Sequence, residues 1–259
     1  MSNKAQRVPA RFVQLGCLVV IMLLLAIPAI QRAAAQRNNS GALPIGNYCF
    51  GSPLYDRYNN PATEPPVGIG SQKFEPAMAA FDDQAADDFV LTTGIGGIYL
   101  TGVRVMGDYS IGGGPAASFN IYFYQNAAGN VPGVQFAQFM DLPYTGTPPE
   151  FVICLPSPFG VAPGTYWVSV QANQNSNPNG QWFWRNRTVQ SHAGATWQNP
   201  GDGYGTGCVT WNRKNSCMAD QVWPDQVFQI LGFHEGPTPS PQSTPTPRPR
   251  PTPVPRPTP

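Results

Sequence analysis

The sequence predicts an all-β protein: a single antiparallel β-sandwich of jelly-roll type, followed by a Pro-rich C-terminal tail. Three observations predict it. Pro contributes 30 and Gly 27 of the 259 residues, which argues against long helices. Apolar residues alternate with polar ones over short segments, which is typical of half-buried strands. Turn-forming pairs such as Pro163-Gly164 separate many of these segments.

The alternation is clearest in two strands. Residues 118–124 place Phe119, Ile121 and Phe123 on one face, and residues 165–172 do the same with alternate apolar side chains. Further strands are expected at 87–92, 99–106, 134–140, 150–155, 181–189, 207–211 and 226–233. Trp182 and Trp184 share a strand face and are expected in the core, because burying large rings stabilises such a domain.

The N-terminus has the pattern of a secretion signal over residues 1–35. Three basic residues precede an apolar run from Leu15 to Ile30, and Ala33 and Ala35 suit cleavage before Gln36. The run is short for a membrane span, although an uncleaved N-terminal anchor is the alternative. We expect a secreted, extracellular or cell-surface protein with no membrane span after cleavage.

The remaining chain divides into three parts: an N-terminal extension over 36–75, the β-sandwich over 76–235, and a tail over 236–259. The tail holds 11 prolines in its 24 residues. Because proline fixes φ and lacks an N–H donor, the tail is expected to be an extended linker. A proline-rich recognition segment is the alternative.

Four cysteines remain after signal removal, and an even number in a secreted chain predicts two disulfides. Four cysteines allow three pairings. Cys208 and Cys217 bracket a short stretch that we expect to be the end of a hairpin, so we pair them and leave Cys49 to pair with Cys154.

The charge of the core argues against nucleic-acid partners. All 14 acidic residues but only 7 of the 15 basic ones lie between Asp56 and Glu235, which gives this part a net charge of −7. A negative domain repels phosphate, so neither DNA nor RNA is an expected ligand.

Several short motifs follow one another in a characteristic order along residues 76–233. Ala-Asp-Asp-Phe-Val begins at Ala86, Pro-Gly-Thr-Tyr-Trp begins at Pro163, and the last strand follows Asp225. This order resembles the secreted bacterial jelly-roll modules akin to carbohydrate-binding modules and pre-peptidase C-terminal domains. The resemblance implies a β-sandwich accessory module that works outside the cell.

Four aspartates lie within seven residues, and a fifth precedes the last strand. Calcium prefers six to eight oxygen ligands, which carboxylates supply. We therefore predict a structural Ca²⁺ site, although a solvated acidic turn is the alternative. Neighbouring residues of a regular strand point to opposite faces, so Asp87 and Asp88 cannot both contact one ion. The predicted ligands are Asp82, Asp83, Asp87, Asp88 and Asp225.

Three aromatic rings fall on the polar faces of the two clearest strands. If those strands are neighbours, Trp167, Tyr122 and Tyr124 form an aromatic strip on which sugar rings could stack. The amides of Asn120 and Gln171 on the same faces would bind sugar hydroxyls. The alternative is that loops cover this face and make it a second small core.

These observations favour a non-catalytic binding or adhesion module for polysaccharide or another surface component. The chain lacks the GxSxG and HExxH motifs of two large hydrolase classes, and no pair of carboxylates is marked out for glycoside hydrolysis. Two alternatives remain: a structural surface-layer or filament subunit that self-associates, and an unrecognised extracellular hydrolase.

Overall fold

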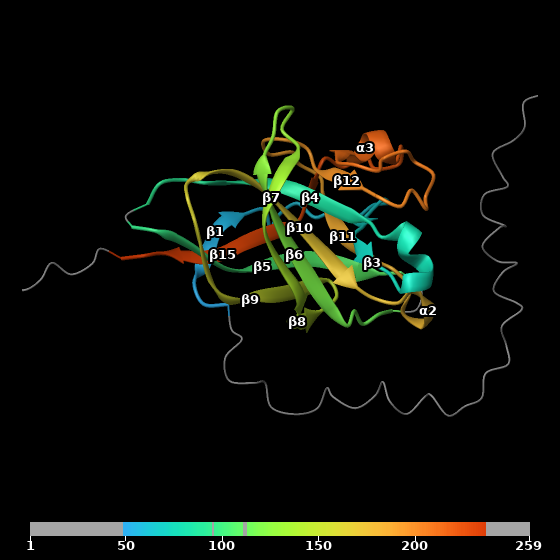
Figure 1. The fold of residues 1–259 in the computed structure, drawn as a ribbon, viewed down its shortest axis with the longest axis horizontal. Helices are drawn as coiled ribbons and strands as arrows, with labels where there is room; N and C mark the ends of the chain where they lie inside the picture. Colours follow the sequence, from blue (N-terminus) through green and yellow to red (C-terminus); the bar gives the residue numbers. More distant parts are fainter. Residues whose placement is uncertain (1–48, 95, 111–112, 237–259) are drawn as a thin grey trace, which may run out of the picture. The chain divides into compact units, whose positions relative to one another are not determined.

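A computed structural model describes residues 49–94, 96–110 and 113–236. The predicted signal peptide and nearly all of the Pro-rich tail lie outside these residues. The described part folds into two β-sheets packed face to face (Figure 1). Among its elements, no helix is long and apolar enough to cross a membrane. The prediction of an all-β fold with two antiparallel sheets is confirmed.

The first sheet has eight strands, and its central strand, β5, pairs with β15, β9 and β11. Strands β1, β2, β8 and β14 extend it. Its members are β1 (Ser52–Asp56), β2 (Gly68–Gly70), β5 (Ile98–Tyr109), β8 (Tyr144–Thr147), β9 (Glu150–Val161), β11 (Trp182–Arg187), β14 (Asp225–Gln226) and β15 (Phe228–His234).

The second sheet has seven strands in the order β13-β12-β4-β10-β6-β7, and β3 joins the edge of β10 in parallel. Its members are β3 (Gln72–Lys73), β4 (Gln84–Leu91), β6 (Ser118–Asn126), β7 (Pro132–Leu142), β10 (Gly164–Asn173), β12 (Thr196–Gln198) and β13 (Asn212–Arg213). Three short helical turns complete the described part: η3 (Pro76–Phe81), α2 (Ser176–Asn179) and α3 (Lys214–Cys217).

The main core lies between the two sheets and takes the alternate residues that the sequence predicts. Phe119, Ile121 and Phe123 of β6 are fully buried there, opposite β9 and β11. Trp182 and Trp184 are also fully buried in this core, as expected. Burial of large rings removes much apolar surface from water and is a main source of stability.

Eight of the nine predicted strand segments contain strands. The segment 207–211 does not, because residues around Cys208 form a loop before β13 and α3. The expectation of a hairpin end between Cys208 and Cys217 is therefore wrong. Six strands escaped prediction because each is five residues or shorter and shows little alternation: β1, β2, β3, β8, β12 and β13. Strands β1 to β3 build the described part of the N-terminal extension into the two sheets.

Both predicted disulfides are confirmed. Cys208 pairs with Cys217 across a separation of nine residues, and Cys49 pairs with Cys154 across 105. The second bond ties the chain just before β1 to β9 of the same sheet.

Candidate functional site

The aromatic strip exists, but it is buried. Strands β10 and β6 are direct neighbours, with Trp167 opposite Tyr124 and Ser169 opposite Tyr122, so the three rings share one face of the second sheet. Trp167 is 0%, Tyr122 8% and Tyr124 5% exposed. The prediction of a solvent-exposed strip is therefore wrong, and the rings form a second small core with Ala86.

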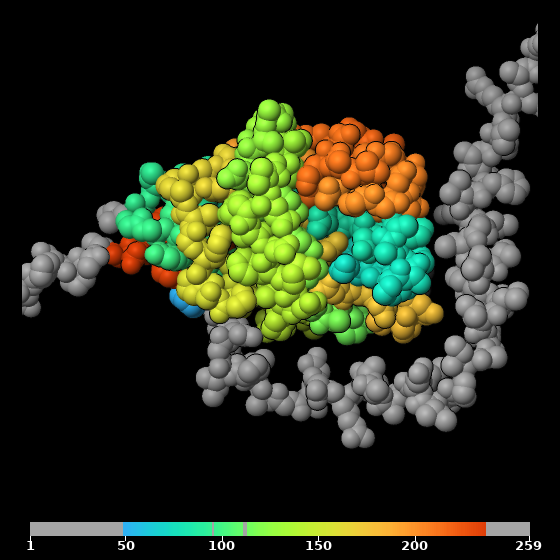
Figure 2. Space-filling view, in the orientation of Figure 1, coloured from blue at the N-terminus to red at the C-terminus, as the bar shows by residue number. Residues whose placement is uncertain are grey.

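The chain between β11 and β14 covers this strip. Trp211 packs edge-on against Tyr124 with ring centroids 5.4 Å apart, and the Arg213 guanidinium lies 5.8 Å from the Trp167 ring. Arg213 also donates hydrogen bonds to the backbone carbonyls of Gly129 and Asn130, at the turn between β6 and β7. Figure 2 shows this segment in orange, packed beside the light-green hairpin of β6 and β7.

The predicted amide residues are also buried, and they belong to a hydrogen-bond network. Asn120 and Asn173 exchange two hydrogen bonds of 2.8 Å. Gln171 accepts hydrogen bonds from Asn120 and from the Tyr122 hydroxyl. Asn173 Nδ2 also lies 3.0 Å from Asp141 Oδ1, at the surface. The predicted residues therefore position Asn173 and Asp141 rather than meet solvent themselves.

Asn173 and Asp141 open onto a hollow of about 300 Å³ at the ends of β10 and β3. This amide-lined hollow is rich in groups that both donate and accept hydrogen bonds. Its lining residues are Lys73, Phe74, Ala117, Asp141, Asn173, Gln174, Asn175 and Asn179.

Gln174 is the residue of the hollow that most needs a partner. It is 4% exposed, and its Nε2 donates to the backbone carbonyls of Asn179 and Gly180. Its Oε1 is buried and accepts no hydrogen bond from the described residues. A buried acceptor without a donor costs about 1–3 kcal/mol, so a water or a ligand hydroxyl is the expected donor.

The five predicted calcium ligands do not converge on one point. The Asp82 carboxylate accepts a hydrogen bond from the backbone N–H of Phe74 and pairs with Lys73 at 3.7 Å. Asp83 accepts from the backbone N–H of Gln72 at 2.6 Å. Both bonds hold the link between β3 and β4.

Asp83 lines a second, more apolar hollow of about 440 Å³, together with Gln181, Phe183 and Tyr204. Burial raises the pKa of this carboxyl to about 8, which hydrogen bonds to its oxygens oppose. Asp83 is therefore a neutral carboxylic acid over much of the acidic pH range.

Asp87 and Asp88 point to opposite faces of β4, as the alternation predicts. Asp87 Oδ2 accepts from the backbone N–H of Gln226 in the other sheet, and Asp88 Oδ2 accepts from the backbone N–H of Ala193 in the covering segment. In the part of the chain that the structure describes, no group of three or more His, Cys, Asp or Glu side chains could hold a metal ion. Each acid instead holds two segments together, so these five side chains do not form a common metal site in the described part of the chain.

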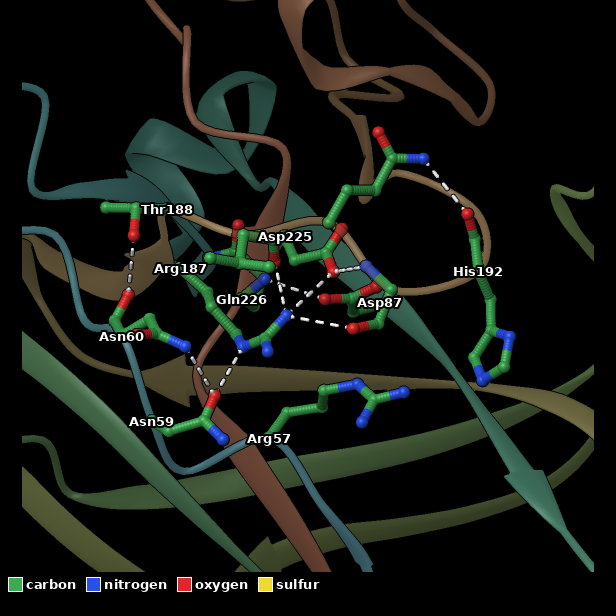
Figure 3. A network of polar contacts seen from close by, with 12 residues as sticks. Arg57, Asn59, Asn60, Asp87, Arg187, Thr188, His192, Asp225 and Gln226 are labelled. Atoms are coloured by element: carbon green, nitrogen blue, oxygen red, sulfur yellow. Dashed lines mark hydrogen bonds and ion pairs between the residues drawn. The ribbon is translucent and has the colours of Figure 1, made fainter.

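Asp225 belongs to a polar network around Arg187, drawn in Figure 3. Asp225 Oδ2 accepts from the backbone N–H of Ser191 at 2.6 Å and lies 3.5 Å from Arg187 Nη1. Arg187 Nε also donates to Asn59 Oδ1 at 2.9 Å. Both charged side chains are almost fully buried, so the pair fixes the start of the covering segment against β14 and the chain after β1.

Burial shifts the pKa values of the charged groups beside this network. It raises the pKa of Asp88 and of Asp225 to about 6. It also raises the pKa of Asp87 well above its usual value, with the Asp225 charge adding to the effect. It lowers the pKa of Lys214 to about 7, against the attraction of Asp87 and Asp225. These shifts favour uncharged forms of Asp87 and Lys214 near neutral pH.

Sequence reasoning missed two buried polar residues, Gln174 and Lys214. Gln174 follows a strand in an Asn-rich turn, where any amide would look solvated. Lys214 stands beside Arg213 in an irregular segment, which is typical of a surface. Neither carries a sequence signal, because tertiary contacts alone bury them.

Comparison with known proteins adds little to this geometry. No family model and no curated protein matches the chain. A search of solved structures finds similarity to the cysteine protease and lectin-like domains of Cwp84, a surface layer associated protein of Clostridium difficile. The identity is 13% and the TM-score 0.41, and the match covers 59% of this chain but 32% of that one.

Proposed function

We propose that the protein is a non-catalytic extracellular module that binds a polysaccharide in the amide-lined hollow. The observation that carries this proposal concerns Gln174. It lines a hollow rich in amides, and its buried Oε1 accepts no hydrogen bond from the described residues. A sugar hydroxyl donates one hydrogen bond and accepts others, so it suits an orphan acceptor surrounded by amide groups.

The composition of the hollow supports a neutral glycan. Lys73 and Asp141 contribute one charge of each sign, and Phe74 supplies a half-buried ring against which a sugar could lie. A volume of about 300 Å³ is at the lower end of the range for small-molecule sites and fits one or two sugar units of a longer chain.

Two further observations support an extracellular, non-catalytic role. The two disulfides suit an oxidising compartment. Asp141 is the single carboxylate among the lining residues of the hollow, whereas most glycoside hydrolases need two.

The proposal is tested by screening the mature protein on a glycan array and then titrating the strongest ligand. Asn175→Ala should weaken binding roughly 2- to 10-fold, which corresponds to one lost hydrogen bond of about 0.5–1.5 kcal/mol. The matched control is Gln125→Ala, which removes an exposed amide on β6 outside the hollow and should bind as the wild type does. Equal binding by all three proteins, or no ligand on the array, contradicts the proposal.

A second candidate function is self-assembly through β7, the edge strand of the second sheet. Among the described strands β7 is hydrogen-bonded to β6 alone, and it exposes Val134 (69%) and Met140 (42%). A long edge strand with exposed apolar residues can pair with a second copy of the chain. Size-exclusion chromatography separates the candidates: assembly predicts oligomers that Val134→Lys breaks, and the glycan-binding module predicts a monomer.

A further inference from the structure

Lys214 is a buried amine in a chain that has three lysines, the others being Lys4 and Lys73. It is 1% exposed and begins helix α3. Its Nζ lies 2.7 Å from Asn186 Oδ1 and 3.0 Å from the backbone carbonyl oxygen of Asp225, and it also contacts Gln226 Oε1. Lysine is almost never fully buried, so the burial of the Lys214 amine needs a chemical explanation.

Asn186 presents its carboxamide to that amine in a fixed orientation. The residue is fully buried in β11, and its Nδ2 donates to the backbone carbonyl of Pro66 at 2.8 Å and to Gln221 Oε1 at 3.0 Å. These two bonds leave Oδ1 facing Lys214. A carbonyl bond is about 1.2 Å long, so Nζ lies at most about 3.9 Å from Cγ, close to the separation of reacting atoms in a near-attack geometry.

The charge states required for a reaction between these groups are favoured by burial. Desolvation lowers the pKa of Lys214 to about 7, so a large share of the amine is neutral and nucleophilic near that pH. Asp87 lies beside this pair, because its Oδ2 accepts a 2.6 Å hydrogen bond from the backbone N–H of Gln226, whose side chain contacts Lys214 Nζ. Desolvation raises the pKa of Asp87, so that this carboxyl can carry a proton. Asp225 is less suited to that role because it pairs with Arg187.

We propose that Lys214 and Asn186 form an intramolecular isopeptide bond, with Asp87 as the proton carrier. Lys214 Nζ attacks Asn186 Cγ, and the Cγ–Nδ2 bond breaks. Asp87 gives its proton to the departing nitrogen and receives one from Nζ, directly or through a water, so it ends as it began. The products are one amide crosslink and one molecule of ammonia, and neither an oxidant nor another co-reactant is needed.

The crosslink would join α3 to β11 and close the covering segment into a covalent loop. That segment lies over Trp167 and carries the Cys208–Cys217 disulfide, which joins two residues of the segment and so does not crosslink it to the rest of the chain. The isopeptide bond would therefore hold the cover in place under reducing conditions as well. Gln226 is the competing carboxamide, because its Oε1 also contacts Nζ.

The test starts with the wild-type mature protein, denatured and reduced. Its mass should be lower than that of its sequence by one ammonia molecule. A terminal Gln36 that cyclises would lose the same mass, so peptide mapping must locate the loss. We expect a branched peptide that contains Lys214 and Asn186. A branch to Gln226, or two separate unmodified peptides, overturns the proposal.

Amine labelling of the same denatured protein gives an independent result that needs no variant. Lys73 should be labelled completely and Lys214 not at all, and a labelled Lys214 overturns the proposal. Lys214→Arg and Asp87→Asn should each abolish the branched peptide, whereas Lys73→Arg should keep it. A branched peptide in folded, disulfide-bonded Asp87→Asn protein overturns the role of Asp87.

Discussion

Trp167 Nε1 donates a 2.8 Å hydrogen bond to Asn126 Oδ1, and the Trp167 ring is fully buried between the second sheet and the covering segment. The indole N–H is therefore hydrogen-bonded, and the apolar ring surface is buried, within the protein itself. The face of the second sheet that carries Trp167 is therefore a second core. For this reason the proposed ligand site is the amide-lined hollow and not the aromatic strip.

Trp167→Ala should destabilise the protein strongly. A large ring that is fully buried leaves a cavity when it is removed, and such substitutions cost about 3–5 kcal/mol. Chemical denaturation of the mature protein measures the loss. Val222→Ala is the control, because this side chain is 63% exposed and its removal should change stability by less than about 0.5 kcal/mol. A similarly small effect for Trp167→Ala would contradict the buried strip.

The two disulfides should contribute unequally. In the chain-entropy description, stabilisation grows with the length of the closed loop. Replacing Cys208 and Cys217 by Ser should cost roughly 2–3 kcal/mol, and replacing Cys49 and Cys154 roughly 4–5 kcal/mol, because their separations are 9 and 105 residues. Denaturation of the two double variants tests the order. A larger loss for the short loop would contradict it.

Asp83 should make the protein less stable as the pH rises. Its folded pKa is about 8, above the ordinary value of 3.8, so the folded state binds the proton more tightly than the unfolded state. The stability from this group is complete below about pH 4 and is lost as the pH rises through about 8.

Asp83→Asn tests this dependence because an amide of the same shape does not titrate. Denaturation of both proteins between pH 5 and pH 9 should show the wild type losing stability relative to the variant as the pH rises, in the window set by the pKa of about 8. Parallel curves, or a wild type that gains stability relative to the variant, would show that the carboxyl is not buried as described.

Calcium should leave the melting temperature unchanged. The sequence predicted one site from five aspartates, but their oxygens accept hydrogen bonds from backbone N–H groups in separate places. A ligand that binds the native state raises the melting temperature by mass action. Thermal melting in EDTA and in millimolar Ca²⁺ makes the comparison, and a higher melting temperature with Ca²⁺ would restore the predicted site.

Local sequence patterns predicted the two sheets and the shared face of the strip well. Side chains in a strand alternate with period two, so the faces of β10 and β6 could be assigned from the residues around Trp167 and Tyr122. The Cys208–Cys217 pairing was accessible for a similar reason, since the two residues are close in sequence.

The cover and the buried charges could not be predicted in the same way. The segment between β11 and β14 has no regular alternation. The short strands β12 and β13 attach it to the second sheet, and single contacts such as those of Trp211 and Arg213 hold it over the strip. The environment of Lys214 depends on Asn186 and Gln226, which come from two other strands. Such contacts form only when segments that are distant in the sequence pack together, so no local sequence pattern predicts them.

The central claim is that a polysaccharide occupies the amide-lined hollow and donates a hydrogen bond to Gln174. The most direct measurement is a two-dimensional NMR titration that follows the side-chain amide signals of the mature protein as the array-selected glycan is added. The account predicts shifts for Gln174 and Asn175, and unchanged signals for Gln125 and Asn212 outside the hollow. Shifts confined to residues away from the hollow would contradict it.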